Sequence, residues 1–368
     1  MTGKLVFENL KHKPMRSLLS VLLIGVPVTL ILTLVGLSHG MIQDSQRRQR
    51  GSGADIVVRA PNAKAVLNQS AAALPEAFVP RLAQEPNVVA AMGVVSHPIE
   101  VILMVNGVNL DEVNRMTGGL HYLAGGKFSG PDDVILDQYY AEQKKKHVGD
   151  TIEIINHPWH ICGIVEGGVL SHILVPLKTL QELDAESNKL SQIYLRLDNP
   201  ANTDAVISHL KSEPGLADYN IWSMQELTSQ IQESVNNQGL SAFVVVIMSI
   251  GVVIGFAVVC LSMYMAVLQR TREIGILKSL GGSRTFILRI ILTEAWIMGI
   301  GGTILGIALS FAARTAIQSF QPASFQMDIV LPWWPRVLAL TLVAATLGAL
   351  YPGLNAAAHD PIEALAYE

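Results

Sequence analysis

The chain has 368 residues, of which 50% are hydrophobic and only 15% are charged, so its composition excludes an intrinsically disordered protein and an ordinary soluble domain. Its formal net charge of −4 excludes the basic surface on which nucleic-acid binding depends. With only 2 cysteines, Cys162 and Cys260, no disulfide framework can hold the fold together. The composition therefore predicts a membrane protein stabilised by packing.

Four long stretches lack charged residues, and each reaches the roughly 20 residues that a helix needs to cross a bilayer. Around them we predict transmembrane helices at 17–43, 234–268, 286–317 and 337–358. The remaining segments are an amphipathic cytoplasmic helix (1–16), an outer domain with a helical stalk (44–233), a cytoplasmic loop (269–285), an outer loop (318–336) and a cytoplasmic tail (359–368). The predicted fold class is a membrane protein, α+β, with a 1 + 3 layout of four transmembrane helices and a large extracytoplasmic α+β domain between the first and the second.

Basic residues flank the spans unevenly, and cytoplasmic segments usually carry the excess. They cluster before the first span and between the second and third, at Lys4, Lys11, Lys13, Arg16, Arg270, Arg272, Lys278, Arg284 and Arg289. This pattern predicts a multi-pass protein of the bacterial cytoplasmic (inner) membrane with both termini in the cytoplasm. Arg47, Arg48 and Arg50 follow the first span on the predicted outer side, against the rule, although long domains cross the membrane largely regardless of charge.

Residues 44–233 alternate between short runs of β-branched residues and runs with helical signals. The predicted strands are 56–58, 88–95, 99–105, 134–136, 152–155, 161–165, 173–175 and 193–197, and the predicted helices are 71–84, 138–146, 177–190 and 203–212. Asn106-Gly107 is a strong hairpin signal, because both central positions of such a turn need positive φ. The domain is therefore predicted to be α+β.

Apolar residues at helical spacing precede the second span, at Met224, Leu227, Ile231 and Val235. They predict a stalk helix that continues into the span as far as Leu268; the alternative is a connector broken at Asn236-Asn237 or Gly239. Inside the spans, glycines recur at four-residue spacing and allow helices to approach closely, for packing or dimerisation. These pairs are Gly251 with Gly255 and Gly302 with Gly306.

No catalytic, cofactor-binding or metal site is predicted, because the chain has no phosphate loop, zinc-protease motif or nucleophile elbow. His157, His160 and Cys162 could begin a metal site, but Pro158 favours a turn followed by an ordinary strand. Glu294 lies in an apolar segment, where a carboxylate often has a function. Its proximity to Trp296 favours instead a position at the membrane interface.

The loop between the second and third spans predicts a short amphipathic helix. Ile274, Ile276, Leu277 and Leu280 form an apolar face, Arg272, Glu273 and Lys278 flank it, and Gly281-Gly282 ends it. Such a helix can dock into a groove of a soluble partner. The alternative is a surface helix whose charges only set the topology.

This loop also resembles a known family. The run QRTREIGILKSLGGSR at 269–284, followed by IILTEA at 290–295, is similar to the hallmark segment of FtsX/MacB-type (type VII) permeases of ABC transporters. FENLKHKPMRSLL at 7–19 and DPIEAL at 360–365 resemble the family's N-terminal helix and C-terminal tail. In the outer domain GKF, VILD, VGDTI and CGIV, starting at residues 126, 134, 148 and 162, resemble the MacB-like periplasmic core. The resemblance covers essentially the whole chain.

The resemblance implies that two permease chains, identical or homologous, bind a dimer of a cytoplasmic ABC ATPase. Its docking surface would be the coupling helix, with Arg270, Arg272, Glu273, Ile274, Ile276, Leu277, Lys278, Leu280 and Gly281. ATP and Mg would then bind the partner, because the few residues before the first span leave no room for an ATPase domain. Membrane lipid is a further partner, and a periplasmic adaptor is compatible with the family.

The function that this resemblance implies is mechanical: ATP-driven motion of the ATPase is relayed to the periplasmic domain, for export or extraction of a lipid-linked, peptide or hydrophobic substrate. A lipoprotein-release or envelope-regulating role is the alternative within the family. A membrane-anchored sensor or scaffold without transport is the alternative from another class.

Overall fold

The computed structural model describes residues 14–61, 73–99, 103–237, 240–269, 276, 279, 283–320, 323 and 326–358. The chain forms two compact units. We call Met1–His39, Ser241–Ile317 and Met327–Glu368 the membrane unit, and Gly40–Leu240 with Gln318–Gln326 the outer domain.

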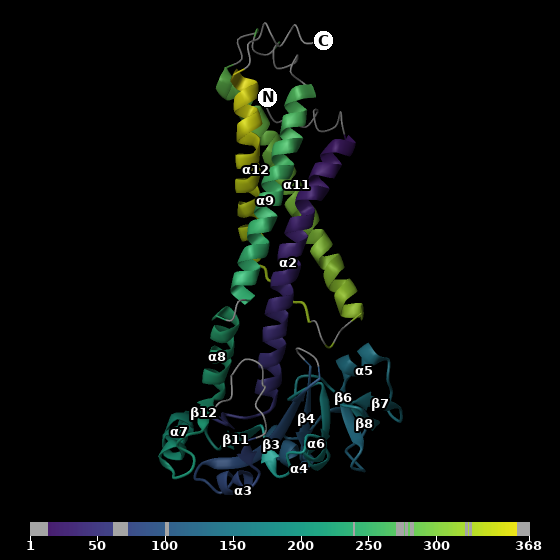
Figure 1. Cartoon of the computed structure of the whole chain (residues 1–368), viewed down its shortest axis with the longest axis vertical. Coiled ribbons are helices and arrows are strands. Elements are labelled where there is room, and N and C mark those ends of the chain that lie inside the picture. Colours follow the sequence, from purple (N-terminus) through teal and green to yellow (C-terminus); the bar gives the residue numbers. More distant parts are fainter. Residues whose placement is uncertain are drawn as a thin grey trace. The chain divides into compact units, whose positions relative to one another are not determined.

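The membrane unit is built from long helices (Figure 1). They are the first part of α2 (Pro14–Gly51), α9 (Leu240–Gln269), α11 (Arg284–Phe320) and α12 (Trp333–Ala358). Among the described residues, Ser17–Gly51, Arg284–Phe320 and Trp333–Asn355 are long and apolar enough to cross a bilayer, and α9 contributes the shorter apolar stretch Met248–Ser262. The chain is thus a multi-pass membrane protein.

The outer domain has mixed strands and helices (Figure 1). Its strands are β1 (Ile56–Arg59), β2 (Leu74–Pro75), β3 (Val88–Pro98), β4 (Met104–Val108), β5 (Tyr122–Gly125), β6 (Asp133–Asp137), β7 (Thr151–Ile154), β8 (His157–Val165), β9 (Ile173–Pro176), β10 (Lys189–Leu190), β11 (Gln192–Leu197) and β12 (Asn220–Ser223). Its helices are the end of α2, α3 (Phe78–Leu82), α4 (Leu110–Thr117), α5 (Gln138–Lys144), α6 (Leu177–Leu183), the 3₁₀ turn η1 (Pro200–Asn202), α7 (Thr203–Ser212) and α8 (Met224–Asn237). The predicted α+β fold class is confirmed.

Ten of these strands form one mixed sheet in the order β12-β1-β11-β3-β4-β9-β6-β8-β5, with β7 paired to β8; β2 and β10 form a separate pair. The β4–β9 and β6–β8 pairs are parallel, and the other neighbours are antiparallel. Both faces of the sheet are covered. Ile56 and Val58 contribute to the core on one face, and Val57, between them in sequence, contributes to the core on the other.

The chain enters and leaves this sheet through neighbouring strands. β1 follows α2, β12 precedes α8, and the two strands pair antiparallel with Ile56 opposite Ser223. The Met224 N–H donates a hydrogen bond to the Asp55 carbonyl at 2.8 Å, next to this pair. The end of α2 and the start of α8 therefore meet the sheet at the same end of two adjacent strands.

Three local predictions were wrong. Asn106-Gly107 is not a turn but lies inside β4, where Gly107 pairs with Val95 of β3 and Val175 of β9. Glycine is needed there because α6 packs on the strand: a Cβ at Gly107 would lie 3.0 Å from Leu180 Cβ. The helix predicted at 71–84 reduces to α3, because Leu74–Pro75 pairs with β10. The helix predicted from 177 ends at Leu183, and Ala185 and Asn188 take left-handed conformations before β10.

Candidate functional site

The predicted ATPase-docking helix lies almost entirely outside the described residues. Of its nine predicted contact residues only Ile276 is described, and its side chain is exposed. An exposed isoleucine at this position is compatible with a docking face, but the docking of a partner stays a prediction.

The predicted stalk residues divide into two groups. Met224 and Leu227 are buried in the core on one face of the outer-domain sheet, together with Val57 and Tyr194. Their helical repeat therefore covers the sheet, and these two side chains are not available for pairing with a second chain. The side chains of Ile231 and Val235 lie outside the described part. α8 ends at Asn237 and α9 begins at Leu240, so the unbroken stalk helix stays a prediction.

The predicted glycine pairs lie at contacts between helices of the same chain. A Cβ at Gly302 of α11 would lie 2.5 Å from Ile24 Cγ2 of α2, and a Cβ at Gly306 would overlap Val28 of the same helix. Thr29 Oγ1 donates to the Gly306 carbonyl at 3.2 Å, across the same contact. Gly251 approaches Ile31, whereas Gly255 has only an ordinary contact with Ala344. Gly302 and Gly306 thus bring α2 and α11 together within one chain.

The His157, His160 and Cys162 side chains do not converge. His157 Nε2 lies 2.9 Å from Asp132 Oδ1, and His160 Nδ1 lies 3.1 Å from Asp133 Oδ1. Cys162 Sγ donates to the Val134 carbonyl at 3.5 Å. Each of these three side chains thus has its own partner on or beside β6. The cluster is explained by pairing between neighbouring strands.

Cys162 is expected to react slowly with alkylating reagents. Burial, together with the negative charge of Asp133, raises the pKa of this thiol to about 12. Because the thiolate is the nucleophile, iodoacetamide at pH 8 should modify Cys162 on the order of a hundredfold more slowly in the folded chain than in urea. A Cys260→Ser background isolates this thiol for mass spectrometry. Equal rates in both states would contradict the assignment.

Glu294 lies on the buried side of α11. It belongs to a stripe with Ile291, Ala295 and Met298, and its exposed fraction is only 4%. Trp296 points to the other side, is half exposed, and donates from Nε1 to Thr346 Oγ1 at 2.9 Å. Glu294 therefore faces the other helices, whereas Trp296 is on the opposite side of α11. The position of Glu294 at the membrane interface stays a prediction.

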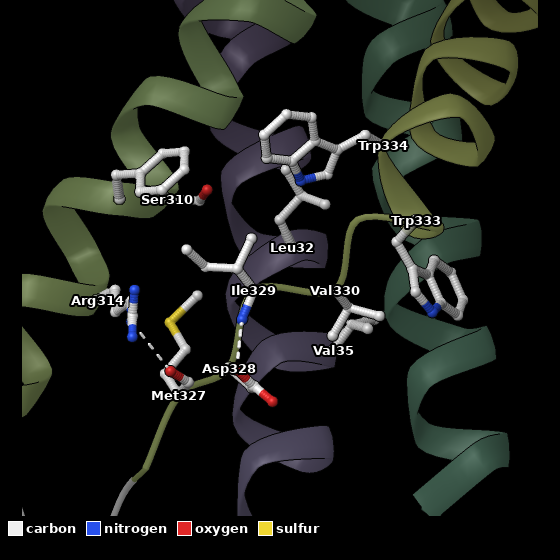
Figure 2. A pocket seen from close by; sticks show the side chains of 11 residues that line it. Leu32, Val35, Ser310, Arg314, Met327, Asp328, Ile329, Val330, Trp333 and Trp334 are labelled. Carbon is white, nitrogen blue, oxygen red and sulfur yellow. Dashed lines mark hydrogen bonds between the residues drawn. The ribbon is translucent and has the colours of Figure 1, made fainter.

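The membrane unit contains a small recess. Between α2, α11 and the segment 327–334, a recess of about 20 Å³ has room for one water molecule. Figure 2 shows Trp334 over Leu32 in this recess and Arg314 reaching the Met327 carbonyl, at 3.1 Å. In the outer domain an open groove of about 830 Å³ lies between the end of α2 and the start of α8, lined by Arg50, Asp55, Gln225 and Thr228 among others. The volume of this groove lies within the range of ligand sites.

A trio of ligand-type side chains was missed by the sequence analysis. Glu85, His209 and Glu213 place one ligand atom each within 4.8 Å of the others. His209 and Glu213 are four residues apart, which was the available signal, but Glu85 comes from a distant segment. Arg81 Nη2 already binds Glu213 Oε2 at 2.6 Å, so this carboxylate has a cationic partner of its own.

A buried charged cluster of the outer domain was also missed. Arg48, Asp137 and His172 are 5%, 2% and 6% exposed. Arg48 Nε donates to Asp44 Oδ2 at 2.7 Å, and its Nη2 donates to Asp137 Oδ2 at 3.0 Å. His172 Nδ1 lies 2.8 Å from the same oxygen, and its Nε2 lies 3.8 Å from Asp44 Oδ2. His172 Nδ1 thus lies between a carboxylate oxygen that can only accept and Arg48 Nη2, 2.9 Å away, which can only donate.

Asp137 is the centre of this cluster, which we call the α2 clamp (Asp44, Arg48, Asp137 and His172). Burial alone would raise the pKa of Asp137, but the hydrogen bond from His172, the charges of His172 and Arg48, and the Tyr140 N–H lower it below 3.8. Its other oxygen, Oδ1, caps α5 by accepting from the Tyr140 N–H at 2.9 Å. The carboxylate is thus held ionised in a buried place, with Arg48 and His172 on one side and helix α5 on the other.

Two family models together match most of the chain. The family described as the MacB-like periplasmic core domain matches residues 17–213, and the family described as the FtsX-like permease C-terminal matches residues 245–361. The macrolide export ATP-binding/permease protein MacB of Salmonella paratyphi A is 26% identical over 300 residues, covering 73% of this chain and 44% of that protein. The protein of the same name from a Shewanella strain is 28% identical over 289 residues, with the same coverage. The chain thus spans less than half the length of these relatives.

Two solved structures are similar to part of the chain. The periplasmic region of MacB from Actinobacillus actinomycetemcomitans has a TM-score of 0.38 and 15% identity, covering 50% of this chain and 95% of that one. The extracellular domain of the ABC-type transporter YknZ from Gram-positive bacteria has a TM-score of 0.35 and 16% identity, covering 46% and 98%.

Proposed function

The chain belongs to the FtsX/MacB-type permeases of ABC transporters, and from that premise we propose that it relays the motion of a separate cytoplasmic ATPase to its outer domain. The work done there is export or extraction of a lipid-linked, peptide or hydrophobic substrate. A macrolide, the cargo in the relatives' name, is a hydrophobic substrate of this kind. The outer domain faces the periplasm, and both termini face the cytoplasm.

The observation that carries this proposal is the continuity of α2. It is one α-helix of 38 residues, about 57 Å long, and its last turns belong to the outer domain. Its end is held there by the α2 clamp and by the Leu170 N–H, which donates to the Arg48 carbonyl at 3.2 Å. Pro27 lies inside α2 and lacks the N–H that would donate to residue 23, but the α-helix continues on both sides of it. A helix changes its length under load less than a flexible linker does, which suits a relay.

The ATPase docks on the predicted coupling helix around Arg272 to Leu280. ATP and Mg bind to the ATPase and not to this chain. Two permease chains, identical or homologous, engage one ATPase dimer. Their contact uses surfaces other than Met224, Leu227, Gly302 and Gly306, which are occupied within the chain. Lipid surrounds the exposed apolar side chains of the membrane unit, and an adaptor in the periplasm is compatible with this arrangement.

The docking surface is tested by Leu277→Asp combined with Leu280→Asp. Two carboxylates on the apolar face should abolish co-purification of the ATPase, measured as vanadate-sensitive ATP hydrolysis in the complex pulled down from native membranes. Binding through a few apolar anchors predicts a loss of activity of about 100-fold or more.

The matched control is Val89→Asp with Leu123→Asp, which adds the same charges at two exposed positions of the outer domain. This variant should keep the ATPase. If the coupling-helix variant inserts normally and still brings down full ATPase activity, docking through this helix is wrong. If the parent chain brings down no ATPase at all, a sensor or scaffold replaces the permease proposal. A lipoprotein bound to the captured complex would favour lipoprotein release.

A further inference from the structure

The α2 clamp lies at the place where the ten-stranded sheet has its narrowest pairing. β6 and β9 pair at only two positions, Ile135 with Leu174 and Leu136 with Ile173. The neighbouring β4–β9 and β6–β8 pairs have four and five. The Asp137 N–H extends the β6–β9 pairing by donating to the His172 carbonyl at 2.9 Å. We call this junction, with Asp137 and His172 at its end, the β6–β9 seam.

The end of α2 is attached to the sheet on both sides of this seam. By covalent connection it continues into β1, which is separated from β9 by β11, β3 and β4. Through Arg48 it also binds Asp137, the last residue of β6, and approaches His172, the residue before β9. One helix end therefore contacts the two strands that form the seam and the strand four positions away.

The loop between β8 and β9 follows the surface of α2 closely. A Cβ at Gly51 would overlap the Gly168 carbonyl, and a Cβ at Gly168 would meet only the Arg47 side chain. The Leu170 N–H binds the Arg48 carbonyl in the same loop. Backbone-to-backbone contact leaves little slack, so a displacement of this end of α2 must be followed by residues 168–172.

Three further observations make Arg48 the centre of the attachment. It is buried, whereas Arg47 and Arg50, which share its turn of α2, are exposed. It is the only one of the three arginines with an ion pair among the described residues. Its guanidinium joins two carboxylates, one from its own helix and one from β6, a geometry that a single ammonium group cannot reproduce. Arg48, one of the three arginines that are exceptions to the positive-inside rule, thus has ion-pair partners in the outer domain.

We propose that Arg48 is a positioning residue that ties the end of α2 to the β6–β9 seam, so that movement of α2 displaces the two halves of the sheet, β12-β1-β11-β3-β4-β9 and β6-β8-β5-β7, relative to each other. This inference rests on the proposed function, because it names the point at which the relayed motion enters the outer domain. Asp44, Asp137 and His172 hold Arg48 in place.

The attachment is tested first in the full chain alone, reconstituted in nanodiscs, by hydrogen–deuterium exchange. Arg48→Met should speed exchange in the peptides covering 133–141 and 166–174 by about tenfold or more, because the seam opens more often without its clamp. Arg47→Met and Arg50→Met, which remove the same charge from exposed positions, should leave both peptides unchanged. Equal exchange in Arg48→Met and Arg50→Met would overturn the proposal, whatever the ATPase does. If Arg48→Met does not fold, Asp44→Asn removes one clamp partner and takes its place.

The displacement is tested in the complex with the ATPase. Spin labels are attached to cysteines introduced by Val89→Cys in β3 and Leu123→Cys in β5, two exposed positions on opposite sides of the seam. Cys162→Ser and Cys260→Ser remove the native thiols. ATP with vanadate should shift the distance between the labels in this background and in Arg50→Met, but not in Arg48→Met, and only partly in Arg48→Lys. If Arg48 only stabilised the fold, the folded Arg48→Met variant would still show the nucleotide-dependent shift in the distance between the labels. A full shift in folded Arg48→Met, or no shift in the background, overturns the proposal. Failure to co-purify the ATPase overturns the proposed function instead.

Discussion

Asp137→Asn is expected to destabilise the outer domain by about 3–5 kcal/mol, the usual effect of removing one partner from a buried ion pair. Asparagine still offers an oxygen to the Tyr140 N–H, so the cap of α5 survives. What disappears is the negative charge facing Arg48 and His172, and Arg48 is only 5% exposed. Urea unfolding of the full chain in detergent, followed by tryptophan fluorescence, measures the change.

Asp132→Asn is the matched control for this prediction. It removes a carboxylate one residue before β6, but Asp132 is largely exposed and its partner is His157. An exposed pair of this kind contributes about 0–1 kcal/mol, so the control should unfold close to the parent chain. If the two variants lose equal stability, the α2 clamp contributes no more than a surface pair.

The same carboxylate predicts how the outer domain responds to acid. Because the folded-state pKa of Asp137 lies below its ordinary value of 3.8, its stabilising contribution is complete above that value and is lost as the pH falls through the folded-state pKa. Unfolding measured between pH 6 and pH 3 should therefore show a loss of stability below about pH 4 that is smaller in Asp137→Asn.

Gly306→Ala is the second large expected effect. An added Cβ would overlap Val28 and lie 2.9 Å from the Gly25 carbonyl, so α2 and α11 would have to separate. Overpacking costs about 1–3 kcal/mol, and a clash with a β-branched side chain and backbone places this variant at the upper end. We expect a lower melting temperature and loss of monodisperse protein in detergent, measured by fluorescence-detected size-exclusion chromatography after heating.

Gly255→Ala separates this clash from the general effect of adding a methyl group to a helix. Its Cβ would meet only Ala344, at 3.8 Å, which is an ordinary contact. Since alanine has the higher helix propensity, this control should be neutral or slightly stabilising. Destabilisation of both variants by the same amount would mean that the α2–α11 contact is not the cause.

Local sequence patterns were sufficient to predict many of the strands and helices of the outer domain. The β-branched runs at 56–58, 134–136 and 173–175 are strands because each has buried neighbours on both faces of the sheet. Helix α4 was missed although its signals were present: Asn109 caps its first turn, and Gly118 ends it in a left-handed conformation. The buried residues Val113 and Met116, three positions apart, are at helical spacing as well.

Other features depended on tertiary contacts that no local pattern contains. Asn106-Gly107 has the composition of a turn, but its glycine is needed for the close approach of α6. In the α2 clamp Arg48 appeared in the sequence only as an exception to a charge rule, and neither Asp137 nor His172 was singled out. They meet only because β6 and β9 become neighbours in the sheet. The burial of Glu294 likewise depends on which side of α11 faces the other helices.

The adjacency of β1 and β12 has a consequence for how the outer domain tolerates force. Because Ile56 lies opposite Ser223, a pull that separates α2 from α8 would unzip this strand pair one hydrogen bond at a time, starting from the loaded end. A pull in which both helices move together would instead load the β1–β11 ladder in shear, so that its hydrogen bonds resist simultaneously. We therefore expect the outer domain to resist a force that pulls α2 and α8 in the same direction better than a force that pulls them apart.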